Sequence, residues 1–379
     1  MCLALLVAFA GTSMVRAAPT DADILNFALN VRAPLPRCVF AAAWPVLACV
    51  ASLHKPPHSA ELSHVHAVQL EYLEAEFYSC AALGKPLDAD LRGGGPASTG
   101  CQKASLDGPT QAYAEELASN EIAHVTYLRK ALGSNAVAMP QINIGSAFSD
   151  AANAAAGSTL SPAFSPYLNS LFFLHGAYVF EPVGVTAYLG AAPSISSKTY
   201  LSAAGGKHWP WSQHSLCRNT AWLARTPHAW HGIQLSLAAC MATYSTLALL
   251  TMLLAAAAIL AVEAYHAGIV DTLLYQQKDT ETPYNVTVAE LVELIADLEN
   301  KVNSKTDAEG IVVMENGQEV ANLVPVNNNA LAFSRTPQEV LSIVYLGSDL
   351  KSGGGFFPAG VNGYFGPQGA GSAVTSKSS

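Results

Sequence analysis

The stretch LASNEIAHVTYL, residues 117–128, decides the fold that we expect for this chain. Its Leu117, Glu121, His124 and Leu128 follow the i, i+4, i+7, i+11 spacing of one helix face. Glu121 and His124 therefore lie on an apolar stripe, where a buried carboxylate and a buried imidazole each need a polar partner. The spacing predicts a helix whose buried face carries chemistry.

The stretch ILAVEAYHAG, residues 259–268, repeats this Glu-x-x-His arrangement. Glu263 and His266 have the same three-residue offset and share a face with Val270 and Leu274. A single Glu-x-x-His on a helix is often a surface pair that arises by chance. Two of them on apolar faces favour a common buried site.

Two further helical stretches place carboxylates among apolar residues. Glu181 is the only formally charged residue between positions 151 and 197, and an unpaired carboxylate there would cost several kcal/mol or be protonated. Glu71 comes from an earlier helical stretch that also contains Glu74 and Glu76. We therefore expect four helices to contribute polar groups to one interior.

This combination matches a known type of metal centre. One Glu from each of two helices and Glu-x-x-His from each of two others form the ligand set of carboxylate-bridged dimetal four-helix bundles. Hard oxygen ligands with two imidazoles suit iron or manganese better than zinc. We expect two such ions, with the two lone glutamates as bridging or terminal carboxylates and the histidines as terminal ligands. The six expected metal ligands are Glu71, Glu121, His124, Glu181, Glu263 and His266.

The expected fold is all-α, a four-helix bundle with additional C-terminal helices and loops. The bundle helices are predicted over about residues 21–80, 109–132, 166–189 and 200–275. Thr287 with Glu290 and Thr336 with Glu339 are two capping boxes, which predict a further helix after each threonine.

Composition excludes several classes of protein. Of the 379 residues, 51% are hydrophobic and only 12% charged, so the chain can bury a large core and is not intrinsically disordered. The formal net charge of −9 leaves no basic surface for phosphates, so we expect no nucleic-acid partner. Metal ions, small ligands and proteins are the partners left to consider.

Two segments differ from the rest of the chain. Residues 31–69 contain one acidic residue and residues 207–258 contain none, although together they hold all five tryptophans. Removing either segment restores a continuous helical pattern across the join. We interpret both as translated introns or a gene-model error, because an insertion in mid-helix would break packing on both sides. Genuine surface insertions are the alternative.

The second segment also suggests a membrane span. Residues 234–262 carry no charged side chain and are long enough to cross a bilayer. If residues 207–258 belong to the product, a membrane-anchored form is an alternative. If they are intronic, the span is an artefact of joining them to an apolar helix.

The N-terminus resembles a secretory signal over residues 1–18, with an apolar stretch at 3–10 and small residues before Pro19. A buried N-terminal helix is the alternative. We expect the protein in the extracellular space or an endomembrane lumen, where Asn285 in an Asn-Val-Thr sequon becomes a glycosylation site.

One disulfide is expected. Outside the signal and the two atypical segments, Cys80 and Cys101 are the only cysteines, and they flank a glycine-rich loop. In an oxidising compartment we expect them to be bridged, which contributes about 3 kcal/mol on loop-closure grounds. Two free buried thiols are the alternative.

The chain resembles the ferritin-like desiccation-related proteins of plants and algae. The resemblance rests on LEYLEAEFY at residues 70–78, NEIAH at 120–124, GVTAYLGAAP at 184–193 and ILAVEAYHAG at 259–268. It extends to RTP at 335–337 and GGFFPAG at 354–360. A departure is Pro182, where the family usually has an acid, and a proline at this point is expected to kink the helix.

The resemblance implies a ferritin-like bundle over residues 19–280, followed by a helical and loop extension over 281–366. The glycine- and serine-rich residues 367–379 predict a disordered tail. The resemblance also implies a secreted protein of the stress or desiccation response. Two functions follow: a dimetal oxidoreductase of catalase-like or ferroxidase-like type, or a non-enzymatic stress protectant with a vestigial metal site.

Overall fold

The computed structural model describes residues 59–191, 257–307 and 310–363. The expected signal over 1–18, the expected tail over 367–379 and residues 207–256 of the second atypical segment lie outside the described residues. The described part is mostly helical, which confirms the predicted all-α class.

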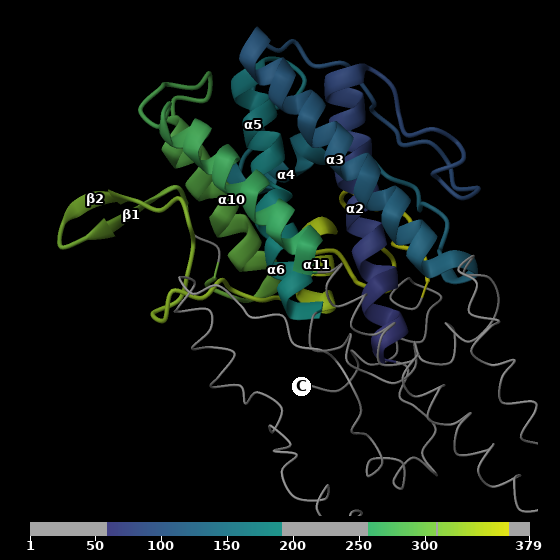
Figure 1. The fold of residues 1–379 in the computed structure, drawn as a ribbon. Coiled ribbons are helices and arrows are strands. Elements are labelled where there is room, and N and C mark those ends of the chain that lie inside the picture. Colours follow the sequence, from purple (N-terminus) through teal and green to yellow (C-terminus); the bar gives the residue numbers. More distant parts are fainter. Residues whose placement is uncertain (1–58, 192–256, 308–309, 364–379) are drawn as a thin grey trace, which may run out of the picture. The chain divides into compact units, whose positions relative to one another are not determined.

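Helices α2 (Ser59–Leu83) and α3 (Gly108–Leu132) pack against each other (Figure 1). The side chain of Asp107 caps α3 by accepting a hydrogen bond from the Thr110 amide, and Gly133 with φ 57° ends it, as predicted for the helix over 109–132.

Helix α2 is continuous across the end of the first atypical segment, between residues 69 and 70. Residues 59–69 contain no proline or glycine, so they can form helical turns in front of Leu70 just as residues 21–30 were expected to do. We expected the atypical segment to interrupt a helix at this join, but α2 runs through it without a break. The other half of the first expected helix, residues 21–30, lies outside the described residues.

The third expected helix is divided in two. Helix α5 (Ser170–Tyr178) ends just before α6 (Glu181–Ala191), and Pro182 is the second residue of α6. A proline is tolerated in the first turn of a helix because the amide hydrogen that it lacks has no partner there. The expected kink is thus a break, and Glu181 becomes the first residue of a new helix.

The fourth bundle helix is described over Ala257–Tyr275. Among the described residues it is the one helix long and apolar enough to cross a membrane, with a mean hydropathy of 1.4. A core helix of a bundle meets the same criterion, and this helix buries Glu263, His266, Val270 and Leu274. Most of the candidate span at 234–262 lies outside the described residues.

The C-terminal extension contains both helices predicted from capping boxes. They are α10 (Val288–Asn303) and α11 (Pro337–Val344). In each, the threonine side chain accepts a hydrogen bond from the backbone amide of the glutamate, and the glutamate side chain accepts one from the backbone amide of the threonine. These two helices contact each other, and α11 also contacts α6.

Sequence reasoning missed two elements. No element was predicted at helix α4 (Ser146–Ala156) or at the hairpin of β1 (Val312–Glu315) and β2 (Gln318–Ala321). The hairpin had a sequence signal, because Asn316 and Gly317 both have positive φ, 52° and 78°, in a two-residue turn that favours Asn-Gly.

An aromatic core and one disulfide hold the C-terminal part of α2. The ring of Phe77 stacks on Phe173 with centroids 5.6 Å apart and also contacts Phe148 and Phe180. The expected disulfide is present between Cys80, at the buried end of α2, and Cys101. The bridge ties the loop that follows α2 to the helix that carries Glu71.

Candidate metal centre

All six predicted ligand residues meet in one interior, and each comes from the helix expected for it. Glutamates 71, 121, 181 and 263 are 0% exposed, and the two histidines are 9% and 4% exposed. Helix α2 carries Glu71, α3 carries Glu121 and His124, α6 carries Glu181, and the Ala257–Tyr275 helix carries Glu263 and His266.

The first half of the cluster surrounds one nitrogen of His124. Nδ1 of His124 lies 3.1 Å from Oε2 of Glu71, 3.1 Å from Oε2 of Glu121 and 3.4 Å from Oε1 of Glu263. A ring nitrogen carries at most one hydrogen, so it cannot donate a good hydrogen bond to three carboxylates. Ligand atoms of these four residues all lie within 4.8 Å of one another, close enough to share one cation.

The second half is built in the same way around His266. Nδ1 of His266 lies 3.3 Å from Oε1 of Glu121 and 3.4 Å from Oε2 of Glu181. Glu181, Glu263 and His266 form a second group whose ligand atoms lie within 4.8 Å of one another. The other ring nitrogen, Nε2, lies 3.1 Å from the amide of Asn120, which fixes the orientation of the ring.

Two carboxylates lie between the histidines. Glu121 turns Oε2 toward His124 and Oε1 toward His266, and Glu263 belongs to both groups of ligand atoms. Glu71 and Glu181 each face one histidine. If two ions bound here, Glu121 and Glu263 would lie between them, while Glu71 and Glu181, of the two roles expected for the lone glutamates, would take the terminal one.

Each terminal carboxylate is held by a buried tyrosine. The hydroxyl of Tyr188 donates to Oε1 of Glu71, and the hydroxyl of Tyr78 donates to Oε1 of Glu181. The other oxygen of each carboxylate stays turned toward a histidine. Sequence reasoning missed Tyr188, although it follows Glu181 by seven residues, two helical turns, and so lies on the same face of α6.

Two nearby residues with aromatic rings lie outside the cluster. Tyr265, directly before His266, is 73% exposed and so faces away from the bundle interior. His175 is a buried core histidine. Its Nδ1 lies 2.8 Å from the carbonyl oxygen of Leu171, and burial lowers its pKa to about 4, so it stays neutral.

The acids and histidines of the cluster compete for protons. Burial, together with the charge of Glu121, raises the pKa of Glu71 to about 8. Burial alone would raise the pKa of Glu121, but His124 and His266 outweigh it and lower that pKa to about 2. Burial would lower the pKa of His266, but Glu121 and Glu181 raise it to about 10. In the absence of ions, the histidines therefore carry protons at neutral pH.

The donor set fits two divalent cations. Among the described residues, both oxygens of Glu263, Oε1 of Glu121 and Oε2 of Glu181 are buried without a hydrogen-bond partner. Four ligand carboxylates with neutral imidazoles balance the charge of two divalent ions. Carboxylate oxygens with two imidazole nitrogens are the ligands that iron and manganese prefer.

A glycine gives the cluster its space. A Cβ atom at Gly184 would lie 2.6 Å from Oε2 of Glu263, closer than any ordinary contact. We expect Gly184→Ala to keep the fold, since alanine favours a helix by about 1 kcal/mol, but to displace Glu263 and weaken metal binding about tenfold or more.

Thermal melting and metal titration test this prediction together. Gly268→Ala is the matched control, because a Cβ there meets nothing within 4 Å on the helix that carries Glu263. We expect the control to bind metal as the unchanged chain does. Equal metal affinity in both variants would contradict the tight fit at Gly184.

Comparison with known proteins agrees with the fold. Residues 65–215 match the family model of the ferritin-like domain. The chain is 28% identical over 306 residues to the ferritin-like catalase Nec2 of Nesocodon mauritianus, an alignment that covers 78% of this chain and 81% of that protein. It is 29% identical over 306 residues to the desiccation-related protein PCC13-62 of Craterostigma plantagineum, covering 78% and 80%. No solved structure matches the chain. These similarities confirm the resemblance seen in the sequence: residues 65–215 match a ferritin-like domain, and the chain is similar over most of its length to a desiccation-related protein and a ferritin-like catalase.

Proposed function

We propose that the buried cluster binds two iron or manganese ions and that the protein performs redox chemistry on a small oxygen species as part of a stress response. One observation carries this proposal: three carboxylate oxygens lie 3.1 to 3.4 Å from Nδ1 of His124. A proton satisfies one of these oxygens, whereas a cation satisfies all of them.

The roles of the residues follow from their positions. Glu121 and Glu263 would span the two ions, and each histidine would bind one of them through Nδ1. The hydroxyls of Tyr78 and Tyr188 would keep the terminal carboxylates from rotating away. Bound iron or manganese would supply the redox couple for this chemistry.

Hydrogen peroxide is the first substrate to test, because one relative is named a catalase. Disproportionation converts two molecules of peroxide into two of water and one of dioxygen. We expect the protein reconstituted with Mn²⁺ or Fe²⁺ to release dioxygen from peroxide in this ratio, or to oxidise Fe²⁺ with dioxygen. A protein that holds two ions and does neither would support the alternative, a non-enzymatic protectant.

Metal binding is expected to strengthen as pH rises. The ligands must lose their protons to bind an ion, and the metal-free protein holds protons on His266, with a pKa of about 10, and on Glu71, with a pKa of about 8. Below the pKa of such a group the ion must displace its proton, so the affinity for the ion falls about tenfold for each unit by which the pH decreases. Titrations with Mn²⁺ between about pH 6 and pH 8 measure the slope. A flat profile would contradict proton displacement.

We further propose that the protein enters the secretory pathway, as the N-terminal residues suggest. Asn285 of the sequon is exposed and has a left-handed backbone conformation in a turn, so its side chain is accessible. Protein secreted by a eukaryotic host should lose mass on treatment with a peptide N-glycosidase, and Asn285→Gln should abolish that loss. An unglycosylated secreted product would contradict the use of this site.

A further inference from the structure

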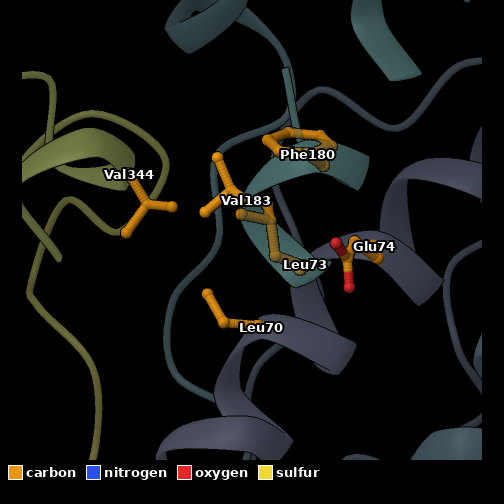
Figure 2. Close-up of a pocket in the computed structure, with 7 residues that line it drawn as sticks. Leu70, Leu73, Glu74, Phe180, Val183 and Val344 are labelled. Carbon is orange, nitrogen blue, oxygen red and sulfur yellow. The ribbon is translucent and has the colours of Figure 1, made fainter. Parts of the chain in front are cut away.

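A small pocket lies beside the cluster of six predicted ligand residues. Its walls come from α2, from α6 with the residue before it, and from α11, and Figure 2 shows residues that line it. The volume open to the centre of a water-sized molecule is about 10 Å³, which is room for about one water. The lining residues are Leu70, Leu73, Glu74, Phe180, Val183, Gly184 and Val344.

Glu74 is the one ionisable residue in this apolar lining. It is 3% exposed, and its Oε2 has no hydrogen-bond partner among the described residues. Its neighbour Glu76 is buried too, but accepts hydrogen bonds from the Leu87 amide at 3.2 Å and the Ser98 hydroxyl at 2.6 Å. A buried carboxyl oxygen without a partner is costly, so a polar ligand in reach of Glu74 would stabilise the site.

Gly184 connects the pocket to the cluster. A Cβ at this position would lie 2.6 Å from Oε2 of Glu263 and 3.3 Å from Oε1 of Glu74, so both carboxyl groups face the space that the glycine leaves. The pocket and the cluster of ligand residues therefore share the space beside Gly184.

We propose that this pocket holds one water molecule, which a peroxide molecule would displace, and that Glu74 positions this oxygen ligand at the Glu263 edge of the cluster. The peroxide part of this inference rests on the proposed function; the water part does not. Glu74 has no place among the six ligand residues, and its role would be that of a positioning residue.

Crystal structures of the metal-free full chain test the pocket directly. We expect density for one water within hydrogen-bond distance of Oε2 of Glu74 in the unchanged protein and beside the amide in Glu74→Gln. Glu74→Leu should lose this water because it removes the polar partner, and Val344→Phe should lose it because it fills the space. Density that elongates after a peroxide soak identifies peroxide as a ligand; unchanged density restricts the ligand to water. An empty pocket in the unchanged protein, or a water that persists in Glu74→Leu, would overturn the proposal.

The metal-loaded protein gives a second readout. Glu74→Leu should keep the full metal content, while its KM for peroxide rises about tenfold and kcat changes less, and Glu74→Gln should restore most of the KM. Loss of metal from Glu74→Leu would overturn the positioning role, because Glu74 would then be a ligand. If the unchanged loaded protein fails to turn over peroxide, the proposed function fails, and the crystallographic result still decides whether Glu74 holds an oxygen ligand. If Glu74→Leu does not fold, Val344→Phe tests the loss of the same water by filling the pocket, and the converse also holds.

Discussion

Replacing Glu121 by glutamine is expected to remove both metal ions, whereas replacing Glu71 removes one. Glu121 faces His124 through Oε2 and His266 through Oε1, but Glu71 faces only His124. The amide keeps the volume of the side chain and loses the charge and one of the two acceptor oxygens. Since loss of a residue that merely supports a ligand costs 10- to 100-fold in affinity, we expect at least about 100-fold here for both ions.

Metal content after dialysis measures this difference. Glu315→Gln, an exposed glutamate in β1, is the matched control and should keep two ions. Glu263→Gln should behave like Glu121→Gln, because Glu263 belongs to both groups of ligand atoms just as Glu121 faces both histidines. A Glu121→Gln protein that retains one tightly bound ion would contradict the bridging position.

A chain without the two atypical segments is expected to fold with the same centre. None of the six ligand residues lies in residues 31–69 or 207–258, and Cys80 and Cys101 lie outside them as well. Joining Asn30 to Leu70 should place residues 21–30 in the turns that residues 59–69 now form at the start of α2.

The shortened chain has no tryptophan, so its fluorescence should come from tyrosine alone. We expect protein from the native source to show the same emission and to yield no peptide spanning residues 208–218. Tryptophan emission with such peptides would show that the segments belong to the product and overturn the intron interpretation. Loss of helical signal in the shortened chain would show that they contribute to folding.

The helices that carry the centre could be predicted because their buried faces hold polar residues at helical spacing. A glutamate and a histidine three residues apart on an apolar stripe, as in Glu121 and His124, fix both the helix and its buried side. The capping boxes at Thr287 and Thr336 fixed two further helix starts, because the side chain and the backbone satisfy each other locally.

What the sequence could not supply depends on contacts between distant residues. The positions of Glu121 and Glu263 between the two histidines follow from how four helices meet, which no spacing within one helix encodes. The hydrogen bond from Tyr188 to Glu71 joins residues 117 positions apart. Pro182 did indicate a kink, but the position of Glu181 inside the cluster required the packing of α6 against α2.

Metal analysis of the purified full-length protein tests the central claim most directly. We expect about two ions of iron or manganese per chain by mass spectrometry of the intact, dialysed protein, and none in Glu121→Gln. Protein that contains no transition metal, and that binds none when Mn²⁺ or Fe²⁺ is supplied at about pH 8, would contradict the dimetal centre.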